Sequence, residues 1–114
     1  MMSIQRILPY TKQLVLLALY DVLEQENSEY HKDTGGDIHA GVTVYGNYSE
    51  FSFTVSEDIP ATNLSVAVVL PSIGLSEQGK KRAENYLADR VEQLLENELK
   101  IKNLIAKQTK GAKK

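Results

Sequence analysis

Apolar and polar residues alternate with a period of two in three successive segments in the middle of the chain. The alternation covers residues 38–45, 50–55 and 64–70. Such a period puts the apolar side chains of a strand on one face, so each segment is predicted to be a β-strand with one buried face. Turns that contain glycine or proline separate the segments. The pattern predicts an antiparallel meander of three to four strands, with residues 30–32 as a short additional strand.

The polar positions of this alternation predict a second, outer face of the sheet. Its members are His39, Thr43, Tyr45, Ser52, Thr54 and Ala67. An antiparallel sheet can leave such a face in contact with water. We therefore expect the outer face to be either solvated or a docking surface.

Helical segments flank the predicted meander. A short strand at residues 3–8 precedes Pro9, which suits the first turn of a helix, and this helix is predicted to run from residue 10 to about residue 26. A second helix is predicted from Glu77 to about Lys107, with Ser76 as its N-cap. The elements define an α+β domain in which the long C-terminal helix packs on one sheet face.

The apolar residues of the last helix fall into two groups. Its first half carries the stripe that a core requires: Ala83, Leu87, Val91, Leu94 and Leu95. The helix is about 45 Å long and the predicted strands about 30 Å, so its second half is expected to extend past the sheet. That half nevertheless contains Leu99, Ile101, Leu104 and Ile105. We expect these residues to need a partner, either the first helix or a second copy of the chain.

Length, composition and charge fit one folded domain. The 114 residues are 42% hydrophobic and 25% charged, the usual mixture for a protein with a single core. The predicted domain covers residues 1–107, and residues 108–114 form a basic C-terminal tail. Residues 1–60 carry three basic and nine acidic side chains, whereas residues 61–114 carry ten basic and six acidic ones. Such an asymmetry occurs in chains that pair with themselves or meet an anionic partner, and it also arises by chance where two solvated helix faces differ in charge.

Several classes of chemistry lack their residues in this sequence. The chain has no cysteine, which excludes disulfides, thiolate metal sites and cysteine nucleophiles. Glycine-rich phosphate loops and the nucleophile elbow of hydrolases do not occur. His31 and His39 flank a turn at Asp33 without the spacing of a metal site, and Glu50 and Glu57 are an odd number of residues apart, which predicts opposite strand faces. We predict no enzyme, no metal site and no cofactor.

No segment of the sequence is predicted to target or anchor the chain. The longest apolar run, residues 14–20, is well below the roughly 20 residues that cross a bilayer, and the N-terminus lacks the segments of a signal peptide. The absence of cysteine fits a cytoplasmic protein. We therefore expect a cytoplasmic location and no membrane partner.

The order of the predicted elements resembles that of the helix-grip domains, the START and polyketide-cyclase-like superfamily. The resemblance rests on residues 4–9, which lead into the first helix, and on the segment from Gly36 to Glu98. Members curve the sheet around the C-terminal helix and hold a lipid or other apolar small molecule between them, and some chaperone-like relatives bind proteins. The chain is shorter than such domains by some strands. The resemblance carries no motif and transfers no functional residue.

Three functions are compatible with these patterns. The first is a non-enzymatic binding or association domain that forms a homodimer through the second half of the last helix, the first helix or the outer sheet face. The second is a carrier of an apolar small molecule, lined by Phe51, Phe53, Val66, Val68, Leu87 and Val91, although the same residues form an ordinary core if no void lies between them. The third is an RNA-binding module that uses Lys80, Lys81 and Arg82, which a pI near 5.7 disfavours.

Overall fold

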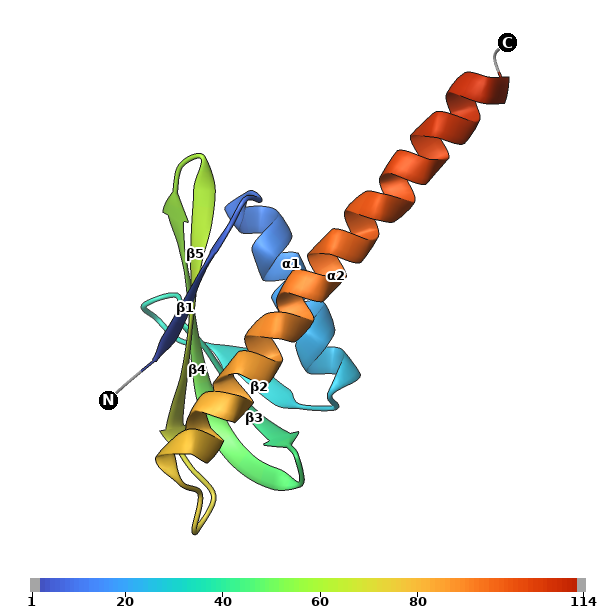
Figure 1. The fold of residues 1–114 in the computed structure, drawn as a ribbon. Coiled ribbons are helices and arrows are strands. Elements are labelled where there is room, and N and C mark those ends of the chain that lie inside the picture. The colour runs from blue at the N-terminus through green and yellow to red at the C-terminus, as the bar shows by residue number, and fades with distance from the viewer. Residues whose placement is uncertain (1–2, 113–114) are drawn as a thin grey trace.

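The computed structural model describes the backbone of residues 3–112 and the side chains of residues 3–97. Its elements follow the order β1 (Ile4–Leu8), α1 (Lys12–Gln25), β2 (Glu29–Lys32), β3 (Ile38–Val44), β4 (Asn47–Asp58), β5 (Ala61–Leu70) and α2 (Glu77–Ala112). The five strands form one antiparallel sheet, and both helices pack on the same face of it (Figure 1). The predicted α+β fold, with a long helix on one sheet face, is confirmed.

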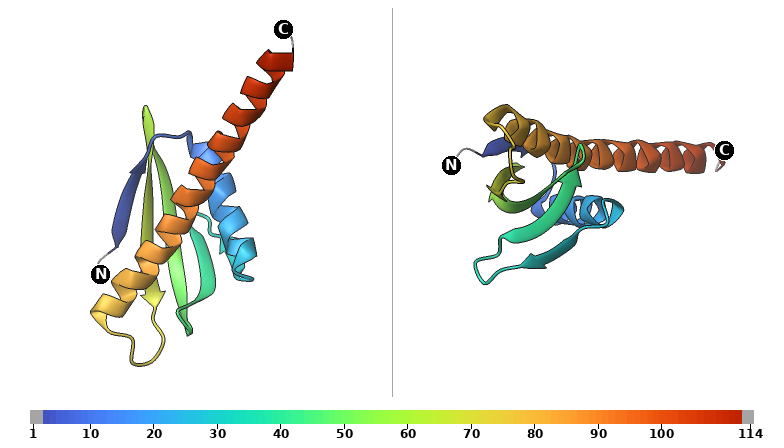
Figure 2. Two further views of the ribbon diagram at one scale, coloured as in Figure 1. Left: turned by 45° about the vertical axis from the view of Figure 1, so that its right-hand side comes forward. Right: turned by 90° about the horizontal axis from the view of Figure 1, so that it is seen from below.

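The sheet has the order β1-β5-β4-β3-β2, so the first strand pairs with the last. Ile4 of β1 lies opposite Val66 of β5, and Leu8 lies opposite Thr62. The strands β2 to β5 follow as the predicted meander. α1 connects the β1 edge with the β2 edge, and it runs beside α2 over the helix-covered face (Figure 2).

Residues with a positive φ angle make two of the turns. Gly36, between β2 and β3, has a φ of 96°, and Tyr45 and Gly46, between β3 and β4, have φ angles of 51° and 81°. Two consecutive positive φ angles make the tight hairpin turn that matches the twist of the flanking strands. This turn consists of Tyr45 and Gly46, because β3 ends at Val44 and β4 begins at Asn47.

The core lies between the sheet and the two helices. Alternate residues of β3, β4 and β5 point into it, and Phe51 and Phe53 have no exposed surface. The helices contribute Val15, Ala18, Leu19, Val22 and Leu23 from α1, and Ala83, Leu87, Ala88, Val91 and Leu95 from α2. The first half of α2 thus carries the predicted core stripe, and α1 packs against both the sheet and α2.

Polar contacts also join α2 to the sheet. Arg6 on β1 forms ion pairs with Asp89 at 2.8 Å and with Glu92 at 3.0 Å. The buried carboxylate of Glu84 accepts a hydrogen bond of 2.9 Å from the Val68 N–H on β5. Burial raises the pKa of the Glu84 carboxyl above its ordinary value, because the ionised form loses its hydration.

α2 extends well beyond the sheet and α1 (Figure 1). Its last described core residue is Leu95, and the helix continues to Ala112, past the predicted end at Lys107. Residues 96–112, which we call the α2 extension, are about 25 Å long at 1.5 Å per residue. The predicted interface residues fall within it, and their side chains lie outside the described residues: Leu99, Ile101, Leu104 and Ile105. Between residues 3 and 112, no helix is long and apolar enough to cross a membrane.

Candidate functional site

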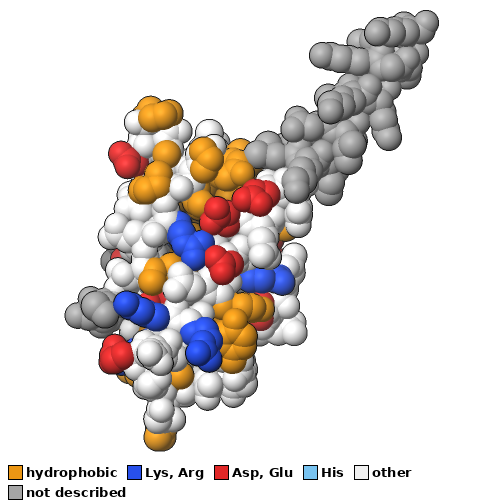
Figure 3. Space-filling model, in the orientation of Figure 1, with side chains coloured by type: hydrophobic (Ala, Val, Ile, Leu, Met, Phe, Trp, Pro, Cys, Tyr) orange, Lys and Arg blue, Asp and Glu red, His pale blue; other side chains and the backbone are white. Residues whose placement is uncertain are grey.

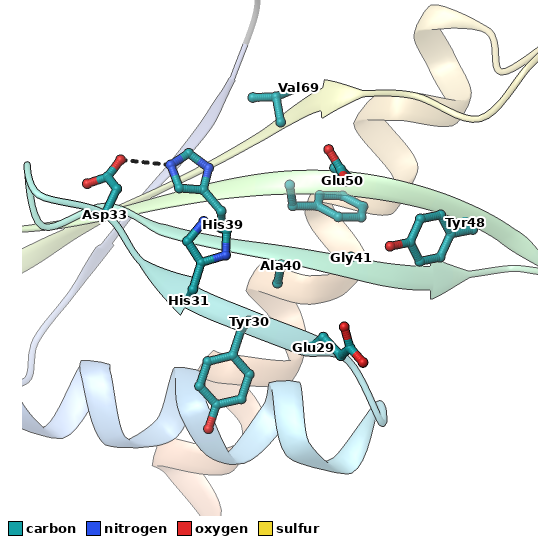
Figure 4. Close-up of a pocket in the computed structure, with 11 residues that line it drawn as sticks. Glu29, Tyr30, His31, Asp33, His39, Ala40, Gly41, Tyr48, Glu50 and Val69 are labelled. Atoms are coloured by element: carbon teal, nitrogen blue, oxygen red, sulfur yellow. Dashed lines mark hydrogen bonds and ion pairs between the residues drawn. The ribbon is translucent and has the colours of Figure 1, made fainter.

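The sheet face opposite the helices, the outer face, contains a hollow of about 520 Å³ (Figure 4). Its side chains come from four neighbouring strands and the turn after β2. They include Glu29 and His31 of β2, Asp33 of the turn, His39 and Gly41 of β3, Tyr48 and Glu50 of β4, and Val69 of β5, and Tyr30, Ala40 and Phe51 complete the lining. The hollow thus lies on the side of the sheet that neither helix covers.

A glycine between two glutamates forms the floor of the hollow. The strand register puts Gly41 opposite Glu29 on one side and opposite Glu50 on the other. Since neighbouring strands are about 4.8 Å apart, the Cα atoms of the two glutamates are about 10 Å apart. Both glutamates are exposed, and neither takes part in an ion pair among the side chains of residues 3–97. Their carboxylates are therefore accessible to a partner.

Tyr48 lies over Gly41 and forms one wall of the hollow. A Cβ atom at position 41 would collide with the hydroxyl of Tyr48, so only glycine leaves room for the ring in this place. Tyr48 is nevertheless 58% exposed. An exposed tyrosine offers an apolar ring face and a hydroxyl to a partner, and the ring face also attracts cations.

Two stacked histidines line the hollow near its other end. His31 and His39 lie opposite each other in the register of β2 and β3, with ring centroids 5.4 Å apart. Nε2 of His39 lies 2.8 Å from a carboxylate oxygen of Asp33, and the other oxygen of Asp33 accepts a hydrogen bond from the Asp37 N–H. The contact with His39 lowers the pKa of the Asp33 carboxyl. Asp33 is therefore ionised at neutral pH and adds negative charge to the hollow.

The charges of the hollow favour a cationic partner. Three carboxylates line it, from Glu29, Asp33 and Glu50, and its described lining contains no lysine or arginine. A concave surface with charges of one sign attracts groups of the opposite sign. Among the side chains that the structure describes, no group of three or more His, Cys, Asp or Glu residues is arranged to hold a metal ion. The hollow is better suited to ammonium or guanidinium groups.

The six residues predicted to line a ligand cavity all lie in the core. Val68 is 4% exposed and the others have no exposed surface: Phe51, Phe53, Val66, Leu87 and Val91. They belong to one cluster of buried apolar residues between the sheet and the helices. Of the six, Phe51 also borders the hollow on the outer face, and none lines a groove of about 350 Å³ along α2.

The predicted basic cluster begins α2. Lys80 forms an ion pair with Glu77 at 2.9 Å, and Lys81 and Arg82 are exposed. Arg82 also lines the groove along α2, which Asp89 shares. Figure 3 shows lysine and arginine side chains interspersed with aspartate and glutamate over this side of the molecule. A phosphate backbone attracts surfaces that are more uniformly basic.

Tyr45 does not lie on the outer face, where the alternation had predicted it. Its ring packs against Tyr86 of α2, with centroids 5.4 Å apart. The positive φ angle at Tyr45 ends the alternation of β3 and turns the side chain toward the helix. In contrast, His39, Ser52 and Ala67 lie side by side in the register, as expected for three residues of the outer face.

Sequence reasoning missed the grouping of Glu29, Gly41, Tyr48 and Glu50. It compared Glu50 with Glu57 along a single strand, whereas these four residues come from three neighbouring strands. One signal in the sequence points to part of the group. A two-residue turn at positions 45 and 46 puts residue 43 opposite residue 48 and Gly41 opposite Glu50.

Comparison with known proteins assigns no family to the chain. The sequence matches no protein-family model, and no curated protein shows a significant match to it.

Proposed function

We propose that the chain is a non-enzymatic association domain that self-associates through the α2 extension. The proposal rests on the length of α2. The last described core residue is Leu95, but the helix continues to Ala112, about 25 Å further. Helices in proteins are stabilised mainly by packing of an apolar face rather than by the propensity of their residues. A helix that leaves its own core therefore needs another surface.

The sequence of the α2 extension supports the same proposal. Ile101, Leu104 and Ile105 follow the three- and four-residue spacing that puts side chains on one side of a helix. Leu99 adds a further large aliphatic residue. Burial of one such side chain contributes about 1.5–3 kcal/mol. A second copy of the chain supplies a partner that is always present at the same concentration.

The topology supports the resemblance to helix-grip domains. The sheet curves around the helix side, and its first strand pairs with its last (Figure 2). Among the functions found in that superfamily, protein binding fits this chain better than carriage of an apolar molecule, because the six candidate lining residues are packed within the core. The absence of cysteine supports a cytoplasmic location.

Light scattering on the full chain, over a range of micromolar concentrations, tests this proposal. We expect a dimer, and we expect Ile101→Asp to raise the dissociation constant about tenfold or more, since each copy loses one buried isoleucine. Asn103→Asp is the matched control, because it also adds one negative charge but lies about 200° around the helix from Ile101. A chain that stays monomeric, or a dimer that Ile101→Asp leaves unchanged, contradicts the proposal.

A further inference from the structure

We infer that the hollow of the outer face is a docking site for an arginine of a partner protein, carried by an extended segment that adds to the sheet beside β2. The inference goes beyond the proposed function, because it involves neither the α2 extension nor a second copy of the chain. It rests on three features of the described residues: the open edge of β2, two glutamates of the hollow, and the ring of Tyr48.

The edge of β2 carries backbone groups that are directed away from the sheet. β2 is the last strand in the order β1-β5-β4-β3-β2, so within residues 3–112 no strand pairs with its other side. The Asp33 N–H donates a hydrogen bond of 2.8 Å to the Asp37 carbonyl oxygen, which continues the register of β2 and β3. Hydrogen-bonded and non-hydrogen-bonded pairs alternate along an antiparallel ladder, so the N–H and C=O groups of Tyr30 and Lys32 point to the open edge. Such an edge can accept one more strand from another protein.

Two glutamates flank the place where a guanidinium group would bind. Glu29 and Glu50 lie on either side of Gly41, with Cα atoms about 10 Å apart. Neither forms an ion pair with any side chain that the structure describes, whereas the carboxylate of Asp33 already contacts His39. A guanidinium group is planar and has donors along more than one edge, so it can bind one carboxylate on each side. An ammonium group is a point charge without such a plane.

The ring of Tyr48 forms the surface between these two glutamates. Its hydroxyl lies over Gly41, so a partner meets the ring rather than the glycine (Figure 4). The side chain is 58% exposed. The planar guanidinium of arginine stacks on aromatic rings, and this contact adds to the attraction of the carboxylates. The hollow therefore selects arginine over lysine.

A strand added beside β2 carries an arginine into the hollow. Its backbone lies about 4.8 Å from β2 and about 10 Å from Gly41, which is two strand spacings away. Residues directly opposite each other in an antiparallel pair point to the same face, so the residue opposite Glu29 points to the outer face. From there a long side chain passes over Glu29 toward Tyr48 and Glu50, whereas a short side chain ends at the edge of the sheet.

An extended protein segment fits this place better than a free small cation. Sites for small molecules enclose most of the ligand, whereas the walls of this hollow are exposed side chains such as Glu29, Tyr48 and Glu50. A segment that pairs with β2 adds backbone hydrogen bonds to the contacts of its arginine. A free cation makes only the latter.

Fluorescence anisotropy with a labelled peptide tests the inference on the full chain. The probe is a fluorescein-labelled heptapeptide, Thr-Val-Thr-Arg-Thr-Val-Thr, and the matched probe has citrulline, a neutral isostere, in place of the arginine. We expect the arginine peptide to bind at least tenfold more tightly than the citrulline peptide at low salt. Equal binding of the two peptides, or no binding of either, overturns the inference. A lysine peptide that binds as tightly as the arginine peptide overturns the selection of a guanidinium group.

Substitutions in the chain locate the binding site of the arginine peptide. Glu29→Gln with Glu50→Gln should weaken binding about tenfold, because both carboxylate charges of the site are removed. The matched control, Glu57→Gln with Asp58→Asn, removes two negative charges at the other end of β4 and should stay within about twofold of wild type. Tyr48→Ala should weaken binding about two- to fivefold and Tyr48→Phe should not. Far-UV circular dichroism and a urea transition establish that each variant is folded, and a folded hollow variant that binds like the wild type overturns the docking site.

Methylation of the peptide backbone tests the pairing with β2. With the arginine opposite Glu29 in an antiparallel pair, the N–H groups of the two threonines beside the arginine point at β2, and the N–H of the arginine points away. N-methylation of these two threonines should weaken binding at least tenfold, whereas N-methylation of the arginine should change it by less than about threefold. Equal effects, or the reverse pattern, overturn the pairing with β2.

Discussion

Truncation of Leu87 distinguishes a solid core from a ligand cavity between the sheet and α2. Its side chain has no exposed surface and belongs to the core cluster. Leu87→Ala removes the equivalent of about three methylene groups, which at about 0.8 kcal/mol each amounts to about 2.4 kcal/mol of lost burial. The void left behind adds to this, and substitutions of this kind in packed cores cost about 2.7–5.0 kcal/mol. We expect Leu87→Ala to lower the free energy of unfolding by about 3 kcal/mol.

Urea unfolding followed by circular dichroism measures this loss as a shift of the midpoint at constant m-value. The protein is kept at the lowest workable concentration, so that self-association does not add to its stability. The matched control is Leu17→Ala on α1, where the side chain is 62% exposed and the expected change is within about 0.5 kcal/mol. A loss below about 1 kcal/mol for Leu87→Ala would mean that Leu87 lines an existing void. The carrier function would then regain its support.

Three further predictions concern α2 and the outer face. Because burial raises the pKa of Glu84, the wild type should lose stability as the pH rises from the ordinary glutamate pKa through the raised one. Glu84→Gln keeps an oxygen that can accept the hydrogen bond from the Val68 N–H but cannot ionise. This variant should therefore lack the loss when urea unfolding is measured at a series of pH values. Arg6→Gln should lower the free energy of unfolding by about 1 kcal/mol at low salt and by less at high salt, as measured by thermal unfolding. Gly41→Ala should displace the hydroxyl end of the exposed Tyr48 ring, so the free energy of unfolding, measured by urea unfolding, should stay within about 0.5 kcal/mol of the wild-type value.

Each of these three predictions has a contrary result. Parallel pH profiles for Glu84→Gln and the wild type would mean that this carboxyl does not titrate differently in the folded and unfolded states. A salt-independent effect of Arg6→Gln would point to packing of the arginine stem rather than to its ion pairs. A large loss of stability in Gly41→Ala would show that the Tyr48 ring cannot move aside and that its packing over Gly41 stabilises the sheet.

The strands could be predicted from the sequence because one buried face imposes a period of two on each of them. The alternation at Ile38, Ala40 and Val42, for example, corresponds directly to the buried positions of β3. The sheet order could not be predicted in the same way. The pairing of Ile4 with Val66 joins two strands that are far apart in the sequence. It depends on the path that α1 takes over the sheet between β1 and β2, and the local periodicity of a strand does not encode that path.

The hollow depends on the relative register of four neighbouring strands, so its residues could not be grouped from one strand at a time. Glu29 and Glu50 meet only because both lie opposite Gly41. The short strand β2 has almost no apolar alternation, so its sequence leaves its register undetermined. The departure of Tyr45 from the outer face has a local cause, because a positive φ angle at a non-glycine residue interrupted the strand pattern.

Burial of the α2 extension in the dimer can be measured most directly with a single labelled cysteine, since the sequence contains no cysteine of its own. Ile101→Cys carries a fluorophore whose emission depends on the polarity of its surroundings, and Asn103→Cys, about 200° around the helix, carries the same label as the control. The proposed self-association predicts that the emission of the label at position 101 shifts to shorter wavelength as the protein concentration rises through the dissociation constant, with a smaller shift at position 103. Emission at position 101 that does not change with concentration, or an equal shift at both positions, would contradict it.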